Sequence, residues 1–154
     1  MPIYNINSIH QYLKTQTGKK VVFTNGCFDL LHPGHIQYLT QAKALGDCLI
    51  VGLNSDQSIQ TIKGSGRPIC NQQFRATMVD ALKPVDAVVI FEESTPMALI
   101  SIIKPHIHVK GGDYQVTSLP EYDTVIQYGG QVQCLSFLDG YSTTSLIERI
   151  QSIH

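Results

Sequence analysis

The segment Thr24–His35, TNGCFDLLHPGH, places two histidines, a proline and a glycine at the start of a predicted helix. His32 and His35 are three residues apart, so both side chains lie on one face of that helix. Pro33 suits the first turn because its missing N–H is not needed there, and Gly34 lets a ligand approach the backbone. Free N–H groups and the helix dipole attract anions at such a position. The segment therefore predicts a polyphosphate site with two imidazoles as additional donors.

Two other chemistries fit the same segment less well. The HxxH spacing of His32 and His35 could hold a metal ion, but no third ligand follows at a suitable spacing. The turn at Asn25 and Gly26 lacks the GxGxxG pattern that brings a pyrophosphate to a helix, which argues against a nicotinamide-dependent redox domain. The two histidines indicate instead an enzyme that handles a reacting triphosphate.

Apolar runs alternate with amphipathic segments along the chain and predict the elements that position these histidines. The apolar runs predict five strands, at Val21–Thr24, Asp47–Asn54, Asp86–Phe91, His106–Lys110 and Gln131–Phe137. The amphipathic segments predict helices at Ser8–Thr15, Gly34–Leu45, Gln72–Leu82, Thr95–Ile103, Leu119–Tyr128 and Thr143–Ile150. We therefore expect a doubly wound, Rossmann-like α/β domain with a five-stranded parallel sheet, helices on both faces and a ligand at the carboxyl ends of the strands.

Length and composition limit the class of protein. The 154 residues fit one domain, which we divide into an N-terminal helical extension (1–18) and a catalytic core (19–154). Eleven basic and twelve acidic residues provide no basic field for nucleic acid. Apolar runs are too short for a membrane span, and the N-terminus does not resemble a signal peptide. Four widely spaced cysteines without a CxxC pair indicate free thiols and a cytoplasmic protein.

Two further segments carry residue types that bind phosphate. Lys63 and Arg67 belong to KGSGRP, a glycine-rich loop that could close over phosphates or form a solvated basic turn. Ser142, Thr143 and Thr144 precede the last predicted helix, so Ser142 is either a simple N-cap or part of a second anion site.

Six other polar positions have a functional or a structural interpretation. Asp29 could place Mg²⁺, which takes few carboxylates, or could order the turn before the histidines. Asp113 in KGGD could bind a sugar hydroxyl, and the glycines before it allow close approach to a base or ribose. Arg75 could contact phosphate but is expected to be solvated, and Asp56 is expected to cap a helix. His106 and His108 share one side of a strand and are interpreted as structural.

The motifs also resemble one known family in the order in which they occur. They are TNGCFDLLHPGH (24–35), ALGDCLIVGLNSD (44–56), KGSGRPI (63–69), VDAVVIFEESTP (85–96), VKGGDY (109–114) and DGYSTTSLIERI (139–150). Together they resemble the HxGH nucleotidylyltransferase superfamily, which includes the cytidylyltransferases. More narrowly, they are similar to the D-glycero-D-manno-heptose 1-phosphate adenylyltransferase domain of bacterial lipopolysaccharide-precursor synthesis. HxGH alone indicates the superfamily, whereas VKGGDY with DGYSTT is far more specific.

The resemblance implies a reaction and a set of site residues. The implied reaction transfers AMP from ATP to D-glycero-D-manno-heptose 1-phosphate, with Mg²⁺ as cofactor, and gives ADP-heptose and pyrophosphate. It implies catalytic roles for His32, His35 and Lys63, and substrate contacts for Asp29, Arg67 and Asp113. The nucleotide-binding set is Asn25, Gly26, Cys27, Phe28, Gly34, Lys110, Gly111, Ser142, Thr143 and Thr144.

The same resemblance implies partners and leaves alternatives open. A sugar kinase is fused to this domain in many bacteria and is absent from these 154 residues, so we expect a separate kinase to supply the sugar phosphate. A homodimer is expected by analogy with the superfamily. Guanylyl transfer to the same sugar phosphate remains open, as does cytidylyl transfer to glycerol 3-phosphate or a phosphorylated amino alcohol. A nucleotide-sensing module without catalysis is the alternative from another class.

Overall fold

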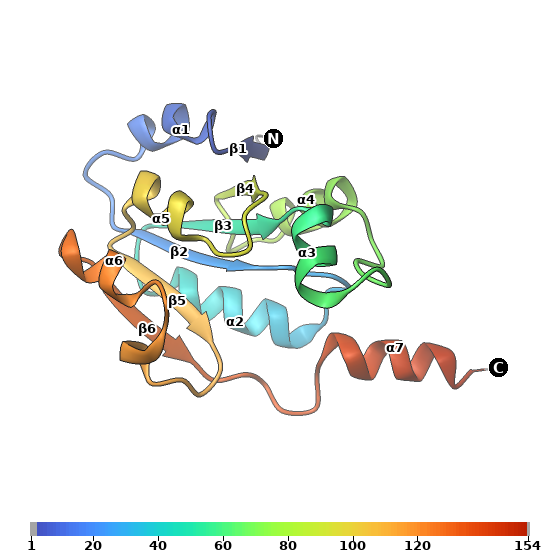
Figure 1. The fold of residues 1–154 in the computed structure, drawn as a ribbon. Helices are drawn as coiled ribbons and strands as arrows, with labels where there is room; N and C mark the ends of the chain where they lie inside the picture. Colours follow the sequence, from blue (N-terminus) through green and yellow to red (C-terminus); the bar gives the residue numbers. More distant parts are fainter. Residues whose placement is uncertain (1–2, 154) are drawn as a thin grey trace.

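The computed structural model describes residues 3–153, which form a six-stranded parallel sheet covered by helices (Figure 1). The strands are β1 (Ile3–Asn5), β2 (Val21–Gly26), β3 (Cys48–Asn54), β4 (Ala87–Phe91), β5 (Ile107–Gly111) and β6 (Gln131–Leu135). Their order across the sheet is β1-β4-β3-β2-β5-β6, and every neighbouring pair is parallel. The predicted Rossmann-like α/β fold is confirmed, but the predicted number of five strands is wrong.

The additional strand is β1, which pairs with β4 at the edge of the sheet, with Ile3 opposite Val88. Three residues are too few to show a period-2 pattern, so the sequence gives β1 no clear signal. The strand lies within the segment expected to be a helical extension, and the expected helix follows it as α1 (Ile9–Thr15).

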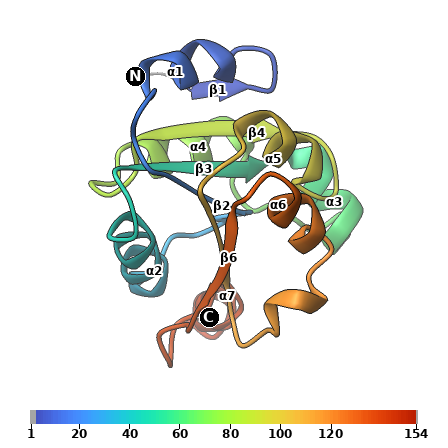
Figure 2. The ribbon, with the colours of Figure 1, turned by 90° about the vertical axis from the view of Figure 1, so that its left-hand side faces the viewer.

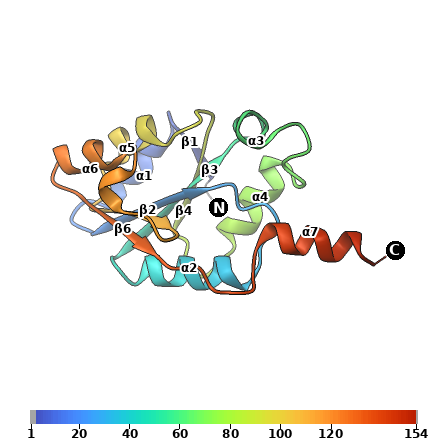
Figure 3. The ribbon, with the colours of Figure 1, turned by 60° about the horizontal axis from the view of Figure 1, so that its bottom comes forward.

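Helices cover both faces of the sheet, as predicted. They are α1, α2 (Pro33–Lys43), α3 (Asp56–Lys63), α4 (Gln72–Asp80), α5 (Met97–Ile103), α6 (Tyr122–Gln127) and α7 (Thr143–Gln151), with a short 3₁₀ turn η1 (Val116–Ser118). One core cluster packs α1, α5 and α6 against the sheet, and a second packs α2 and α4 against the opposite face. Figure 2 shows the two layers, with α2 and α5 on opposite sides of the strands. The last helix, α7, extends away from the sheet (Figures 1 and 3).

The central strands are rigidly placed because they are buried on both faces. Every residue of β3 is buried, and its side chains alternate between the two core clusters. Ile50 belongs to one cluster, whereas Leu49 and Val51 belong to the other. This two-sided burial explains the continuous apolar run in the sequence, and it fixes the strand ends that carry the loops of the site.

Two further observations bear on the class of protein. Within residues 3–153, no helix is both long and apolar enough to cross a membrane. All four cysteines have free thiols: Cys27, Cys48, Cys70 and Cys134.

Candidate active site

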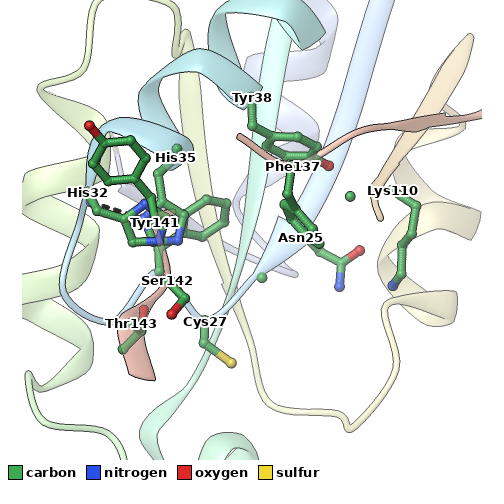
Figure 4. A pocket seen from close by; sticks show the side chains of 14 residues that line it. Asn25, Cys27, His32, His35, Tyr38, Lys110, Phe137, Tyr141, Ser142 and Thr143 are labelled. Atoms are coloured by element: carbon green, nitrogen blue, oxygen red, sulfur yellow. Dashed lines mark hydrogen bonds between the residues drawn. The ribbon is translucent and has the colours of Figure 1, made fainter. Parts of the chain in front are cut away.

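A pocket of about 340 Å³ opens where the direction of chain winding reverses. The chain builds β3 and β4 on one side of β2, and later adds β5 and β6 on the other, so the switch point lies between β2 and β5. Residues from the ends of both strands line the pocket, together with the first turns of α2 and α7 (Figure 4). The lining residues are Asn25, Gly26, Cys27, Phe28, His32, Gly34, His35, Tyr38, Lys110, Gly111, Phe137, Tyr141, Ser142 and Thr143.

The loop that follows β2 is held in a strained conformation. Phe28 and Leu30 both have a φ of 50°, in the left-handed backbone region that residues other than glycine rarely adopt. Such conformations cost on the order of 1–3 kcal/mol each and persist where surrounding contacts impose them. Phe28 is buried, and its ring packs against His35 at 5.3 Å between centroids. The strained loop therefore positions the Phe28 ring, which forms one wall of the site around His35.

His32 and His35 form a stacked pair at the N-terminus of α2. Their ring centroids lie 3.8 Å apart with an interplanar angle of 25°. The backbone N–H of His32 donates to Nδ1 of His35 at 3.2 Å, so a neutral His35 carries its proton on Nε2. Nδ1 of His32 is buried and has no hydrogen-bond partner within the described chain. The pair thus presents imidazole N–H groups beside the free backbone N–H groups of the helix start.

Both histidines are biased toward their neutral forms. Burial lowers the pKa of His32. Burial, followed by the charges of His32 and Lys63, lowers the pKa of His35 to about 4. At neutral pH the pair therefore donates hydrogen bonds from neutral rings, and a bound phosphate would supply the negative charge that the pocket lacks.

A buried network fixes α2 against the strand ends. The Thr24 hydroxyl lies 2.5 Å from the Tyr38 hydroxyl and donates to the carbonyl oxygen of Val109 at 2.9 Å. The Tyr38 hydroxyl also donates to that carbonyl, at 3.2 Å. Burial raises the pKa of Tyr38, so its hydroxyl stays protonated. The network links β2, α2 and β5, which together carry the histidine side of the pocket.

The N-terminus of α7 lies at the pocket beside the histidine pair. The Ser142 hydroxyl accepts a hydrogen bond from the Ser145 N–H at 3.0 Å and so caps the helix. Tyr141 lies parallel to His32, with ring centroids 6.3 Å apart and an interplanar angle of 17°. Figure 4 shows Ser142 and Thr143 on the same side of the pocket as the histidines. Two helix starts therefore meet at one cavity.

The Phe137 ring crosses the end of β5 at Gly111. A Cβ atom on Gly111 would lie 2.6 Å from a ring carbon of Phe137, closer than real side chains approach. The exposed Phe137 ring forms a tilted pair with Tyr38, at 6.5 Å between centroids. The absence of a side chain at Gly111 lets the aromatic wall close over the strand end.

The pocket contains most of the predicted site residues, but not all of them. Thr144 is exposed on α7 outside the pocket lining. Lys63 ends α3 and is exposed, and Arg67 lies half-buried in the loop that follows. Asp113 is exposed and lines a separate cavity together with Asp139. These four side chains do not line the pocket.

Asp29 is engaged by the backbone rather than open to a metal ion. It is 3% exposed, and its two carboxylate oxygens accept hydrogen bonds from the N–H groups of Ile69 at 2.7 Å and Cys70 at 3.0 Å. Among residues 3–153, no group of three or more His, Cys, Asp or Glu side chains could hold a metal ion. Both carboxylate oxygens of Asp29 therefore have backbone partners, and these contacts favour its ordering role.

Arg75 is buried, and the expectation that it would be solvated is wrong. It is 1% exposed and donates to the carbonyl oxygens of Cys27 and Asn54, both at 2.8 Å, and of Cys70 at 2.9 Å. It also pairs with Asp56 at 2.8 Å, while Ser55, not Asp56, caps α3. Helical periodicity could not reveal these partners, because Cys27, Asn54 and Asp56 belong to other elements of the fold, 19 to 48 positions away. Arg75 thus ties the loop after β2 to the sheet.

Three aromatic residues of the pocket were missing from the sequence expectation: Tyr38, Phe137 and Tyr141. Tyr141 directly precedes the Ser-Thr-Thr triplet, and that position was the available signal. Tyr38 and Phe137 carry no comparable signal, since aromatic residues in helices and after strands usually belong to a core.

The fold and the pocket define a Rossmann-like domain with an anion-attracting site at its switch point. The chain belongs to the Cytidylyltransferase-like family, whose model matches residues 23–149. It is 54% identical over 133 residues to the bifunctional protein HldE of Pelobacter propionicus, covering 86% of this chain and 27% of the relative. It is 47% identical over 152 residues to HldE of Geotalea uraniireducens, covering 97% of this chain and 31% of the relative. The chain therefore spans less than a third of these curated relatives.

Two solved structures are also similar to this chain. The lipopolysaccharide core biosynthesis protein of Thermoplasma volcanium is 30% identical with a TM-score of 0.63, and the match covers 81% of this chain and all of that one. A pantoate-β-alanine ligase from Francisella tularensis, solved with an ATP analogue and β-alanine, has a TM-score of 0.60 and 17% identity, and covers 99% and 79% of the two chains. The second likeness shows the fold alone.

Proposed function

We propose that the chain transfers AMP from ATP to D-glycero-D-manno-heptose 1-phosphate, giving ADP-heptose and pyrophosphate. The observation that carries this proposal is the meeting of two helix N-termini, one bearing His32 and His35 and the other Ser142 and Thr143, at one pocket of about 340 Å³. Such a pair of positive helix ends suits the several charges of a triphosphate. Similarity to the HldE proteins and to a lipopolysaccharide core biosynthesis protein supports the choice of sugar.

The chemistry follows from positioning and charge neutralisation. An oxygen of the sugar phosphate attacks the α-phosphorus in line, the bond from that phosphorus to its bridging oxygen breaks, and pyrophosphate leaves. His32 and His35 donate hydrogen bonds to the phosphate oxygens as negative charge builds on the leaving group. No covalent intermediate with the protein is needed, so the thiol of Cys27 has no nucleophilic role.

The remaining site residues have supporting roles in this proposal. The loop Asn25–Phe28 and Gly34 provide backbone contacts, and Ser142, Thr143 and Thr144 hold the β- and γ-phosphates. Lys63 reaches the phosphates when its loop closes, with Arg67 on the substrate phosphate and Asp113 on a sugar hydroxyl. The charge of Lys63 already contributes to the lowered pKa of His35, which supports its approach to the pocket.

Cofactor, partners and location complete the proposal. We propose that turnover requires Mg²⁺ brought with the triphosphate, since a magnesium ion commonly binds substrate phosphates and few carboxylates. A sugar kinase supplies the sugar 1-phosphate, and the free thiols suit the cytoplasm. We expect neither nucleic acid nor a membrane as a partner. The chain is proposed to be a single domain, divided at residue 18 into an N-terminal extension and a catalytic core. A homodimer stays a prediction that sedimentation can test.

A pyrophosphate-release panel tests the proposal directly. Four nucleoside triphosphates are crossed with heptose 1-phosphate, other sugar 1-phosphates, glycerol 3-phosphate and phosphorylated amino alcohols. We expect the largest release with ATP and heptose 1-phosphate, and loss of release with excess EDTA. Preference for GTP would favour guanylyl transfer, and preference for CTP with glycerol 3-phosphate would favour a cytidylyltransferase. If the protein binds ATP but releases no pyrophosphate with any acceptor, it is a nucleotide sensor and not an enzyme.

A further inference from the structure

A buried ionic cluster lies directly behind the pocket wall and takes no part in the mechanism above. His108 of β5 is fully buried, and its Nε2 lies 3.1 Å from Oε1 of Glu121. The same carboxylate oxygen lies 3.2 Å from Nζ of Lys110. The side chains of His108 and Glu121 are 0% and 3% exposed, whereas that of Lys110 is 27% exposed and lines the pocket.

The cluster has a definite protonation pattern. Glu121 accepts from both neighbours, so the His108 proton lies on Nε2, and its Nδ1 is a buried atom without a partner in the described chain. Burial alone would raise the pKa of Glu121, but the hydrogen bond from His108 and the charge of Lys110 outweigh it and hold the pKa at about 2. A permanent carboxylate therefore faces the Lys110 ammonium.

Stability alone gives a weak reason for this arrangement. A buried ion pair repays its desolvation cost poorly, and well-packed apolar residues of similar volume are often as stable. Its consequence for geometry is larger, because a free lysine side chain populates many rotamers and this one is tethered. Figure 4 shows Lys110 on the same side of the pocket as Asn25, away from His32 and Tyr141.

We infer that Glu121, supported by His108, is a positioning residue that holds the Lys110 ammonium at the pocket wall for the bound nucleotide. The inference rests on the proposed function, since it needs a nucleotide in this pocket. Glu121 lies just before α6 and contacts no pocket surface itself, so its effect on the ligand must pass through Lys110.

A double-mutant cycle on ATP affinity tests this inference. Binding is measured by calorimetry with ATP and no sugar phosphate, so that no turnover occurs. We expect Lys110→Met to raise the Kd by about tenfold, the loss typical of one charge-assisted hydrogen bond, and Glu121→Gln to approach the same value. Because both act through one ammonium, the double variant should bind no more weakly than Lys110→Met alone.

Matched controls separate positioning from folding. Glu92→Gln and Lys83→Met change exposed residues outside the pocket and should leave the Kd unchanged. If Glu121→Gln fails to fold, Glu121→Asp replaces it in the cycle. The aspartate keeps the buried negative charge, but its side chain is one methylene shorter, so the carboxylate lies farther from Lys110. Lys110→Arg retains a cation, so in this variant, unlike in Lys110→Met, Glu121→Gln should again raise the Kd for ATP.

The outcomes distinguish this inference from the proposed function. If the unaltered protein binds no ATP, the proposed function fails and the inference fails with it. If the protein binds ATP but Glu121→Gln leaves the Kd unchanged, or its effect multiplies with that of Lys110→Met, the positioning role alone is overturned.

Discussion

The two helices whose N-termini meet at the pocket are held by the fold in different ways. Helix α2 buries Gly34, Tyr38, Leu39 and Ala42, whereas α7 has no buried residue. Figure 3 shows α2 against the sheet and α7 extending beyond it. The histidine side of the site is therefore fixed by the core, while the Ser-Thr side depends on its own cap and on the ligand. Substitutions on the two sides should have different consequences for stability and for binding.

Arg75→Met should cause the largest loss of stability, because it dismantles support for the rigid side. The substitution leaves the buried carbonyl oxygens of Cys27 and Asn54 without their donor. We expect the free energy of unfolding to fall by about 3–5 kcal/mol, as for other broken buried charge networks. Urea denaturation measures the change, with the exposed Arg149→Met on α7 as control. If Arg75→Met and Arg149→Met lower the free energy of unfolding equally, the histidine side of the site is not held more firmly than the α7 side.

His35→Ala should cause the largest loss of catalysis on that side. Removal of one donor to developing phosphate charge typically lowers turnover by about 10²–10³-fold. The pyrophosphate-release assay measures this loss, and circular dichroism should show an unchanged fold. His10→Ala, at an exposed position of α1, is the control and should keep full activity. Normal release from the His35 variant would contradict the role assigned to the pair.

The lowered pKa of His35 predicts a pH dependence of stability. Its folded pKa of about 4 lies below the ordinary value of 6.5, because burial and then the His32 and Lys63 charges disfavour its protonation. Between these values the unfolded chain binds a proton that the folded chain does not, so unfolding becomes easier as pH falls through this window. We expect His35 to account for up to about 2 kcal/mol between pH 7 and 4.5.

Urea denaturation of His35→Asn at the two pH values checks this contribution. The variant should lose less stability on acidification than the unaltered protein, whereas His10→Asn should match it. A pH response unaffected by His35→Asn would show that the ring is not held neutral by burial.

The smallest effect should come from the same substitution made at two helix caps. Loss of a serine N-cap costs about 1 kcal/mol. Ser55→Ala, in a buried cap of α3, should lower the free energy of unfolding by that amount. Ser142→Ala should leave global unfolding unchanged, because α7 is not packed in the core, but raise the KM for ATP about fivefold through fraying of the helix start. Interchanged results would mean that α7 belongs to the folded core.

The sequence predicted the parts of the fold that depend on local pattern. Continuous apolar runs such as CLIVGLN identify strands buried on both faces, and Pro33 after His32 identifies the start of α2. The three residues of β1 gave no clear signal because their pairing with β4 is set by tertiary contacts. Helix α5 begins at Met97, two residues after the predicted start at Thr95, a difference typical of helix boundaries.

The site could be predicted only where chemistry and local geometry coincide. His32 and His35 share a helix face, so their meeting follows from spacing. The contacts of Arg75 with Cys27 and Asn54, and the tether from Glu121 to Lys110, join positions more than 10 residues apart, and no local pattern encodes them. Asp29 shows the converse, since the sequence left open whether it places a metal ion or orders the turn, and its two backbone partners come from a segment 40 positions away.

A crystal structure with a non-hydrolysable ATP analogue and magnesium tests the central claim most directly. The account predicts that the triphosphate lies between the rings of His32 and His35 and the start of α7 at Ser142 and Thr143. Phosphates bound elsewhere, with this pocket unoccupied by the nucleotide, would contradict it.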